Sequence, residues 1–252
     1  PKSLDCLNLL NEPWFYSVLG NHEDLILNNL SNAEYCKTNL TNEEMLVANS
    51  EYGFLKKIYQ LPLIYEIEHI IHGTIYVVHA EILPEHILFN EQGFSSHDMD
   101  RYFASMKSFD FSNAITKFID KHRYTTLDYD LKQKLIWSRK FATNFYKEHQ
   151  DRIENSDFSF MKQEEFEQKI KIFCGHNVVP FPMKIGQQYY LDTGCALGYS
   201  TKELNSYLFT QFGHQYFALS LVDITTGACY GCISTSSNRG EVVKLEKSIY
   251  SL

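Results

Sequence analysis

The sequence lacks any long apolar run, and no stretch approaches the roughly 18 residues that a membrane-spanning helix needs. Its first residues do not form the pattern of a secretory signal peptide. Basic residues are fewer than acidic ones, with 23 Lys and Arg against 31 Asp and Glu and a net charge of −8. This balance argues against nucleic-acid binding through a broad basic surface. We therefore expect a cytoplasmic protein that engages neither membranes nor nucleic acid.

Cysteine is sparse, and the six residues are scattered at positions 6, 36, 174, 195, 229 and 232. Scattered thiols in a chain of this length favour reduced cysteines over a disulfide framework, so we predict no native disulfide. Cys229 and Cys232 have the C-x-x-C spacing that zinc and redox sites also use. Because no second such pair exists and the motif lies inside a strand-like run, we favour two structural thiols.

Hydrophobic residues make up 44% of the 252 residues, which is enough for one substantial core. No internal repeat and no low-complexity linker divides the chain. We therefore interpret 1–252 as a single domain with insertions near 84–130 and 142–168. The first insertion is aromatic, polar and hard to assign, and the second is charged and expected to be exposed.

Apolar periodicity and turn residues divide the rest of the chain into helices and strands. Helices are expected at 1–10, 22–30 and 130–141 and within the polar segment 31–60, and strands at 13–20, 61–68, 73–80, 169–176, 187–194, 214–227 and 228–234. The strands at 61–68 and 73–80 are close enough in sequence to form a hairpin. Helices between the early strands, followed by strands in succession, indicate an α/β fold with a mixed sheet or more than one sheet.

Side chains that can bind a metal follow three of the expected strands. Asn21 and His22 stand in "VLGNHE", His79 in "YVVHAE" and His176 in "IFCGHN". The carboxyl ends of strands form sites in open α/β sheets, and imidazole nitrogens and amide oxygens suit a divalent transition metal. Each residue also has an ordinary explanation: Asn21 as a turn residue, His22 and Glu23 as a helix start, and a lone histidine as a hydrogen-bonded residue. The recurrence of one pattern three times favours a shared site that the fold assembles.

In this order, the segments "GNHE", "VVHAE", "FCGH" and "YYLDTG" resemble the calcineurin-like metallophosphoesterases. "SLDCLNLLNEPWFYSVLGNHE" and "IWSR" are similar to the bacterial and phage-lambda-type serine/threonine protein phosphatase branch, which also contains symmetrical dinucleoside-polyphosphate hydrolases. The resemblance implies a sandwich of two mixed β-sheets flanked by helices. It also implies hydrolysis of phosphate monoesters, first of all phosphoserine and phosphothreonine, by a metal-activated water. The alternatives are a symmetrical dinucleoside-polyphosphate hydrolase of the same fold and a truncated, non-catalytic domain.

The resemblance implies a role for each candidate residue. Asn21, His79 and His176 match three ligands of one metal ion in a site for two divalent cations, with manganese as the expected metal. His22 matches the residue that protonates the leaving oxygen, a task that suits an imidazole with an ordinary pKa of about 6.5. Arg139 resembles an arginine whose guanidinium fork binds phosphate, and a solvated cation at a helix end is an equally weighted alternative.

The family also has two earlier motifs, D-x-H and G-D-x-x-D-R-G, and neither occurs before "GNHE" in this sequence. In the family they supply the other metal's ligands, the bridging aspartate, the aspartate that orients the acid histidine and a phosphate arginine. We therefore expect at most one metal ion in this chain, a sandwich without its first strands, and poor catalysis. The simplest account is that the chain is the C-terminal part of a longer phosphatase. Its expected partner is a phosphorylated protein or a small phosphoester.

Overall fold

The computed structural model describes residues 3–29, 53–82, 129–154, 170–179, 182–185, 188–194, 218–234 and 239–244, and the structural statements below refer to these residues. Most of the segment 31–60 and most of the two expected insertions lie outside them. Among the described residues, no helix is long and apolar enough to cross a membrane.

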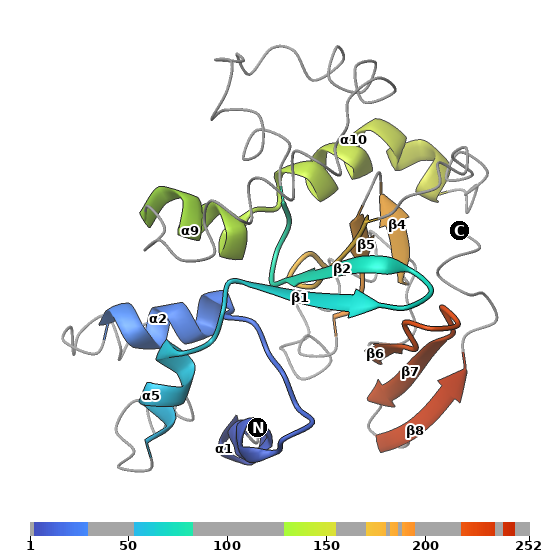
Figure 1. Ribbon diagram of the computed structural model, residues 1–252. Helices are drawn as coiled ribbons and strands as arrows, with labels where there is room; N and C mark the ends of the chain where they lie inside the picture. The colour runs from blue at the N-terminus through green and yellow to red at the C-terminus, as the bar shows by residue number, and fades with distance from the viewer. Residues whose placement is uncertain are drawn as a thin grey trace.

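Five strands form a mixed sheet, here called sheet A, in the order β1-β2-β3-β5-β4 (Figure 1). They are β1 (Ile64–His69), β2 (Gly73–Val78), β3 (Ile170–Cys174), β4 (Met183–Ile185) and β5 (Gln188–Tyr190). The central strands β2, β3 and β5 run parallel, while β1 and β4 pair antiparallel with their neighbours at the two edges. The expected hairpin is therefore present as β1–β2, with Ile64 opposite Val78.

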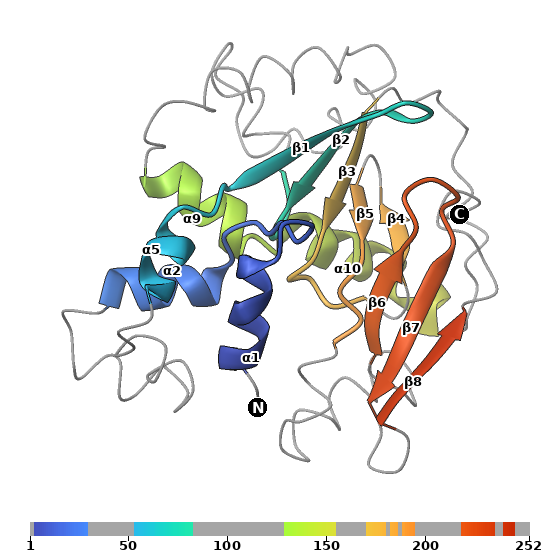
Figure 2. The same ribbon diagram turned by 60° about the horizontal axis from the view of Figure 1, so that its bottom comes forward.

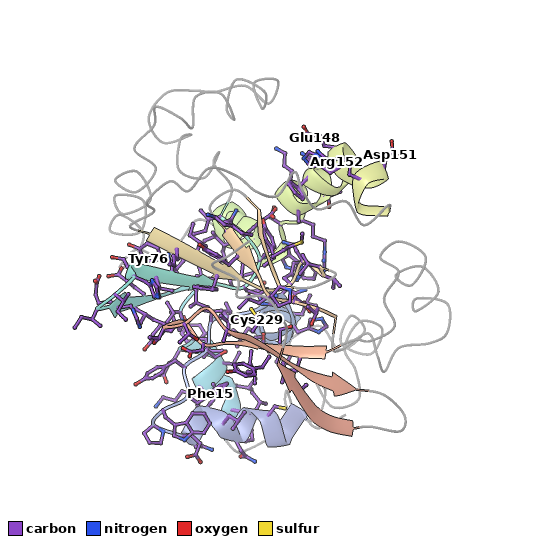
Figure 3. All side chains as sticks on the ribbon, turned by 90° about the vertical axis from the view of Figure 1, so that its right-hand side faces the viewer. Phe15, Tyr76, Glu148, Asp151, Arg152 and Cys229 are labelled. Carbon is purple, nitrogen blue, oxygen red and sulfur yellow. The ribbon has the colours of Figure 1, made fainter. Side chains whose placement is uncertain are left out.

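A second sheet, here called sheet B, packs on one face of sheet A. It is antiparallel and contains β6 (Ala218–Val222), β7 (Cys229–Ser234) and β8 (Arg239–Lys244) in that order. Side chains alternate along a strand, so Ile75, Phe173 and Tyr189 share the face of sheet A that meets sheet B. They form one buried cluster with Cys229, which Figure 3 places among the side chains between the two sheets. The expected α/β class with two sheets is confirmed.

Two helices cover the opposite face of sheet A, α9 (Tyr129–Trp137) and α10 (Lys140–Glu154), as Figures 1 and 2 show from two directions. Tyr76 and Ile172 belong to this face and are 2% and 0% exposed. Because sheet A is covered on both faces, Ile75 on the other side of β2 is also fully buried. Full burial of a large apolar side chain stabilises the fold by roughly 1.5–3 kcal/mol.

The N-terminal helices form a smaller layer with a core of its own (Figure 1). They are α1 (Ser3–Asn8), the short 3₁₀ helix η1 (Leu9–Asn11), α2 (Asn21–Asn29) and α5 (Phe54–Tyr59). Leu19 and Ile26 pack there against Phe54 and Ile58 of α5. This cluster packs α2 against α5.

The strand expected at 13–20 was wrong. Trp14 and Tyr16 are 66% and 64% exposed, whereas Leu19 is only 5% exposed, so burial is confined to the end of the segment. Among the described residues, its backbone bond to a distant segment is the one from the Leu19 N–H to the carbonyl of Pro62 (2.8 Å). Pro62 has no N–H with which to return a bond, so a ladder does not start there.

The helix expected at 130–141 is interrupted by Ser138 and Arg139, which are not helical. Ser138 Oγ accepts a hydrogen bond from the Lys140 N–H (3.4 Å), and the Arg139 carbonyl accepts one from the Thr143 N–H (2.9 Å). Both contacts belong to the start of a new helix, because side-chain oxygens and cap carbonyls bind the first backbone N–H groups. The break therefore places Arg139 in a loop and not on the face of a long helix.

The region expected as a charged, exposed segment begins as a helix, because α10 continues to Glu154. Its far end is charged and exposed as expected, and Glu148, Asp151 and Arg152 lie away from the rest of the structure in Figure 3. The helix is irregular at His149, where φ is −113° and ψ is 16°. Strands β4 and β8 were not expected, because one is three residues long and the other is largely polar.

Candidate functional site

Two parallel strand ends of sheet A carry the two histidines of the predicted site. His79 follows β2 directly, and His176 lies two residues beyond the end of β3. The two strands stay in parallel register up to Val78 and Cys174, so the residues that follow emerge at the same edge of the sheet. The Gly175 N–H donates to the His79 carbonyl (2.9 Å), which keeps the two segments together beyond the strands.

Asn21 reaches this edge from another part of the chain, as the first residue of α2. Its Oδ1 lies 2.8 Å from Nε2 of His79. The ring centroids of His79 and His176 are 4.9 Å apart, with 49° between the ring planes. The structure thus brings together the three side chains that the sequence pattern pointed to. Their function as metal ligands remains a prediction.

Gly20 allows this close approach. A methyl group on Gly20 would lie 2.5 Å from Oε2 of Glu23 and 3.0 Å from Cε1 and Nδ1 of His79. The Gly20 N–H donates to Oε2 of Glu23 (3.1 Å), and the Gly20 carbonyl accepts from the Asp24 N–H (3.0 Å). Glu23 therefore binds back to the helix start, as the glutamate of a capping box does. The expectation that Glu23 belongs to a helix start is confirmed.

His176 has an unusual backbone and an unusual side-chain environment. Its φ is 58°, and among the described residues it is the one non-glycine with positive φ. The left-handed conformation costs a residue with a Cβ about 1–2 kcal/mol, and such strain is retained where the surroundings fix it. The side chain is 8% exposed, and Nε2 has no hydrogen-bond partner among the described residues. A buried polar atom without a partner is costly, so it indicates a position where a ligand can bind.

Both histidines are neutral near pH 7. Burial, followed by the charges of His22 and Arg139, lowers the pKa of His79 to about 4. Burial, followed by the charges of Arg139 and His79, lowers the pKa of His176 to about 3, although a backbone hydrogen bond with Trp137 acts the other way. Neutral imidazole offers a lone pair, and this is the form that binds a metal ion.

Arg139 reaches the site from the break between α9 and α10. Its Nη1 donates to the carbonyl of His176 (2.7 Å). Although much of the residue is exposed, partial desolvation lowers the pKa of Arg139, and the charges of Asp192 and Glu81 oppose this shift. The guanidinium is therefore attached to the His176 loop and is not simply solvated at a helix end. Its binding of phosphate remains a prediction.

His22 follows Asn21 in the first turn of α2 and is exposed. Its charge contributes to the lowered pKa of both His79 and His176. An exposed imidazole beside a buried donor cluster is well placed to give a proton to a bound substrate. Its role as the acid remains a prediction.

Glu81, to which the sequence pattern assigned no role, is a fully buried carboxyl group at the same edge of the sheet. Its Oε1 accepts from the Ser138 hydroxyl (2.6 Å), and its Oε2 accepts from the Tyr190 hydroxyl (3.0 Å), the Ala142 N–H (3.3 Å) and the Asn177 amide (3.4 Å). A signal was present in "VVHAEIL", because a charged residue inside an apolar run is rarely buried without partners.

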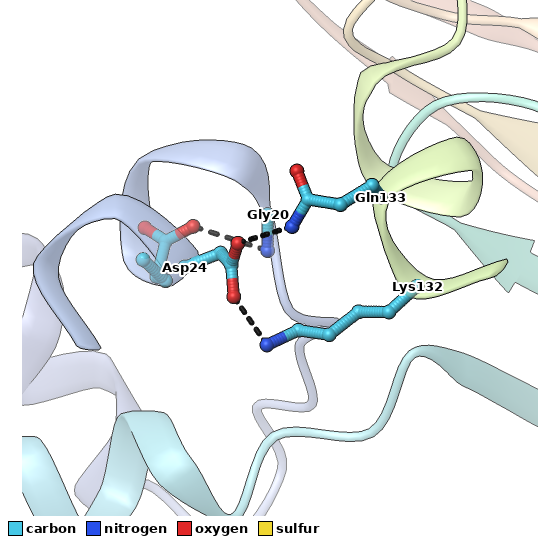
Figure 4. Close-up of polar contacts among 5 residues, drawn as sticks. Gly20, Asp24, Lys132 and Gln133 are labelled. Atoms are coloured by element: carbon cyan, nitrogen blue, oxygen red, sulfur yellow. Dashed lines mark hydrogen bonds and ion pairs between the residues drawn. The ribbon is translucent and has the colours of Figure 1, made fainter. Parts of the chain in front are cut away.

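Asp24 ties α2 to α9, as Figure 4 shows. Its carboxylate is 2% exposed, accepts a hydrogen bond from Nε2 of Gln133 (2.8 Å) and forms an ion pair with Lys132. Asp192 lies just after β5, and its Oδ1 accepts a hydrogen bond from the Gly194 N–H (2.8 Å). Asp24 therefore joins two helices, and Asp192 holds the backbone of its own turn.

The C-x-x-C motif does not form a local metal site. Cys229 and Cys232 are three positions apart on β7, so their side chains point to opposite faces of sheet B. Cys229 lies in the core between the sheets and is 2% exposed. Both are free thiols, as are Cys6 and Cys174, while positions 36 and 195 lie outside the described residues.

The converging donors are two imidazoles and one amide oxygen. Across the described residues, no three His, Cys, Asp or Glu side chains form a set of metal ligands. The unpartnered Nε2 of His176 and the neutral state of both rings fit a divalent transition metal, for which nitrogen and amide oxygen are suitable ligands. The D-x-H spacing does occur later in the chain, at 120–122, and this segment lies outside the described residues.

Comparison with known proteins gives one short relationship. No family model matches the chain. Over 27 residues the chain is 67% identical to serine/threonine-protein phosphatase 2 of Escherichia coli (strain K12). The aligned segment is 11% of this chain and spans 12% of the length of that relative. The similarity therefore supports a relationship to phosphatases over a short segment.

Proposed function

We propose that the chain belongs to a metal-dependent phosphoesterase that hydrolyses phosphate monoesters, with phosphoserine and phosphothreonine side chains as the substrate class. One observation carries this proposal. Asn21, His79 and His176, which are distant in sequence, meet at one sheet edge beside Arg139. The short similarity to a serine/threonine phosphatase supports the same substrate class.

The residues fit a divalent cation, with manganese as the proposed metal. Asn21 would bind it through Oδ1, and His79 and His176 through Nε2. A cation bound there would activate a water molecule and offset the charge of the phosphate group. The chain prepares for it by keeping both imidazoles neutral and one Nε2 without a partner.

Two further residues would act on the substrate. Arg139 presents a guanidinium beside the His176 loop, and its planar fork can bind two phosphate oxygens. His22 is exposed next to Asn21 and would give a proton to the leaving oxygen of serine or threonine. Such acid catalysis typically contributes about 10²–10⁴-fold to the rate.

The test is hydrolysis of an aryl phosphate by the purified 252-residue chain, with and without Mn²⁺, followed by a phosphopeptide and a dinucleoside polyphosphate. We expect a small Mn²⁺-dependent rate, because the described residues provide donors for one metal ion. Loss of this rate in His22→Ala and Arg139→Ala, with Mn²⁺ binding retained, would support the assigned roles. Mn²⁺-independent hydrolysis would contradict the proposal, and a higher rate on the dinucleoside polyphosphate would replace the substrate class.

A further inference from the structure

One carboxyl group joins the segments that carry Arg139 and His176. Glu81 lies two residues after His79, where the chain leaves β2, and it is 0% exposed. It accepts hydrogen bonds from Ser138, which precedes Arg139, and from Asn177, which follows His176. The segments of Arg139 and His176 are therefore both bound to Glu81, which lies next to His79 in the chain.

Direct contacts between the two segments complete this arrangement. The Asn177 amide donates to the Ser138 carbonyl (3.1 Å), and Arg139 Nη1 donates to the His176 carbonyl (2.7 Å). Glu81 also accepts from the Ala142 N–H in the first turn of α10, so the helix that follows Arg139 is fixed as well. The Tyr190 hydroxyl holds the same carboxyl group from the end of β5.

We propose that Glu81 is a positioning residue that fixes Arg139 relative to His79 and His176, so that one phosphate group meets both the guanidinium and the metal. This inference rests on the proposed function of the site. The contacts that carry this inference run from Glu81 to Ser138 and Asn177, the residues next to Arg139 and His176. Partners of this kind, one step removed from a metal, typically change metal affinity or activity by about 10–100-fold when they are replaced.

A merely structural role is the competing explanation, and Gln188 provides a matched control. Gln188 is 4% exposed, and its Oε1 accepts from the N–H of Ile82, the residue after Glu81 (2.8 Å). It therefore stabilises the same stretch of chain through a buried polar contact, but it binds neither the Ser138 segment nor the Asn177 segment. We compare Glu81→Gln with Gln188→Met, since each replacement nearly keeps the size of the side chain. The first turns one acceptor oxygen into an NH₂ donor that faces other donors, and the second removes the oxygen that binds the Ile82 N–H.

Trp137 reports on the His176 segment without any metal or turnover. Its ring lies edge-on to the His176 ring, with 6.1 Å between centroids, and it is one of two tryptophans in the chain. In a Trp14→Phe background, we expect Glu81→Gln to shift the emission of Trp137 and Gln188→Met to leave it unchanged. Thermal unfolding of both variants gives the stability loss against which this difference is judged.

Binding measurements complete the test. By titration calorimetry on the same chains, we expect Glu81→Gln to weaken Mn²⁺ binding about 10-fold or more, together with binding of inorganic phosphate in the presence of Mn²⁺. Gln188→Met should change both affinities less than about twofold, which is our criterion for a change outside the positioning network. Equal effects of the two variants on emission and affinity, at equal loss of stability, would overturn the proposal.

Two further outcomes are covered. If Glu81→Gln fails to fold, Ser138→Ala removes only the hydroxyl that binds Oε1 of Glu81, and it should weaken phosphate binding more than Mn²⁺ binding. Unchanged phosphate binding in that variant would count against Glu81. If the unmodified chain binds no Mn²⁺, the proposed function fails, while the Trp137 comparison still decides whether Glu81 holds the His176 segment.

Discussion

Two histidine pairs among the described residues have nearly the same ring separation and very different surroundings. His79 and His176 have centroids 4.9 Å apart at the end of sheet A. His69 and His72 have centroids 5.0 Å apart at the β1–β2 turn, with 18° between the ring planes. The two pairs would look alike in any search for neighbouring imidazoles.

Hydrogen bonding separates the two pairs. In the turn, His69 Nε2 pairs with the Thr225 hydroxyl (3.2 Å), its Nδ1 accepts from two backbone N–H groups (3.3 Å each), and His72 Nε2 donates to the Thr225 carbonyl (2.8 Å). In the site, His176 Nε2 is buried and has no partner among the described residues. The turn histidines fasten the β1–β2 turn to the loop after β6. Proximity alone therefore does not indicate a metal site. The buried, unpartnered Nε2 of His176 is the observation that supports the proposed one.

Replacement of His176 should have the largest effect on Mn²⁺ binding. A small effect would remove the difference proposed between the two pairs. We expect His176→Gly to weaken Mn²⁺ binding by more than about 100-fold, because it removes a proposed ligand itself and not merely a partner of one. The melting temperature should fall little, since glycine relieves the left-handed backbone at this position. Calorimetry and thermal unfolding test both points. Unchanged Mn²⁺ affinity would remove the metal site from this pair.

The acid dependence of stability should be the next largest effect. The folded pKa of His79 is lowered to about 4 from an unfolded value of 6.5, so the unfolded chain takes up this proton first. The neutral His79 therefore contributes to the free energy of unfolding above pH 6.5. This contribution is lost as the pH falls towards 4, where the loss reaches roughly 3 kcal/mol.

Urea unfolding without metal, between pH 7 and pH 4, measures this loss. The variant His79→Gln should lose less stability over the same range than the unmodified chain. Parallel curves for the two chains would show that His79 is not held neutral by burial.

The contact of Asp24 with Lys132 and Gln133 should matter for the stability of the fold and little for metal binding. Its replacement therefore separates structural residues from those proposed to bind the metal. We expect Asp24→Asn to lower the free energy of unfolding by about 1–3 kcal/mol, because a buried charged hydrogen-bond partner is removed. Lys132 is 23% exposed and can regain water, which limits the cost. The free energy of Mn²⁺ binding should change less than the free energy of unfolding. A loss of affinity as large as that of His176→Gly would mean that the α2–α9 contact controls the site.

The smallest effect is expected in the turn pair. His72→Ala removes the hydrogen bond to the Thr225 carbonyl, which is worth about 0.5–1.5 kcal/mol in a partly exposed position. Mn²⁺ binding and phosphate hydrolysis should stay as in the unmodified chain. Weakened Mn²⁺ binding in His72→Ala would mean that the turn pair also takes part in metal binding, and the contrast between the pairs would fail.

The sequence predicted the strand ends better than it predicted what surrounds them. His79 and His176 could be placed because apolar strands with a period of two point to their own carboxyl ends, and parallel strands share that edge. Arg139 was recognised only through "IWSR", since the break that puts it in a loop depends on contacts of Ser138 with distant residues. Glu81 was missed because its partners come from three other segments, and no local pattern encodes such a network.

The failed strand at 13–20 has the same kind of cause. Its apolar composition is that of a strand, but pairing also needs a neighbour with free N–H and C=O groups. Pro62 offers only a carbonyl, and this could not be read from the segment itself. Local composition thus predicted an apolar segment, and tertiary contacts decided whether that segment joined a sheet.

The site is built almost entirely from long-range contacts, and this has a consequence for how it appears during folding. Asn21 and His79 are 58 positions apart, and Glu81 binds partners 57, 96 and 109 positions away. The turn pair, by contrast, is separated by three positions and can form as soon as the hairpin does. Closing long loops costs entropy before any contact repays it, so non-local structure forms slowly. During refolding, the Trp137–His176 contact should therefore appear in the slowest phase, after the helical signal, and the chain would pass through states that have sheet and helix but no assembled site.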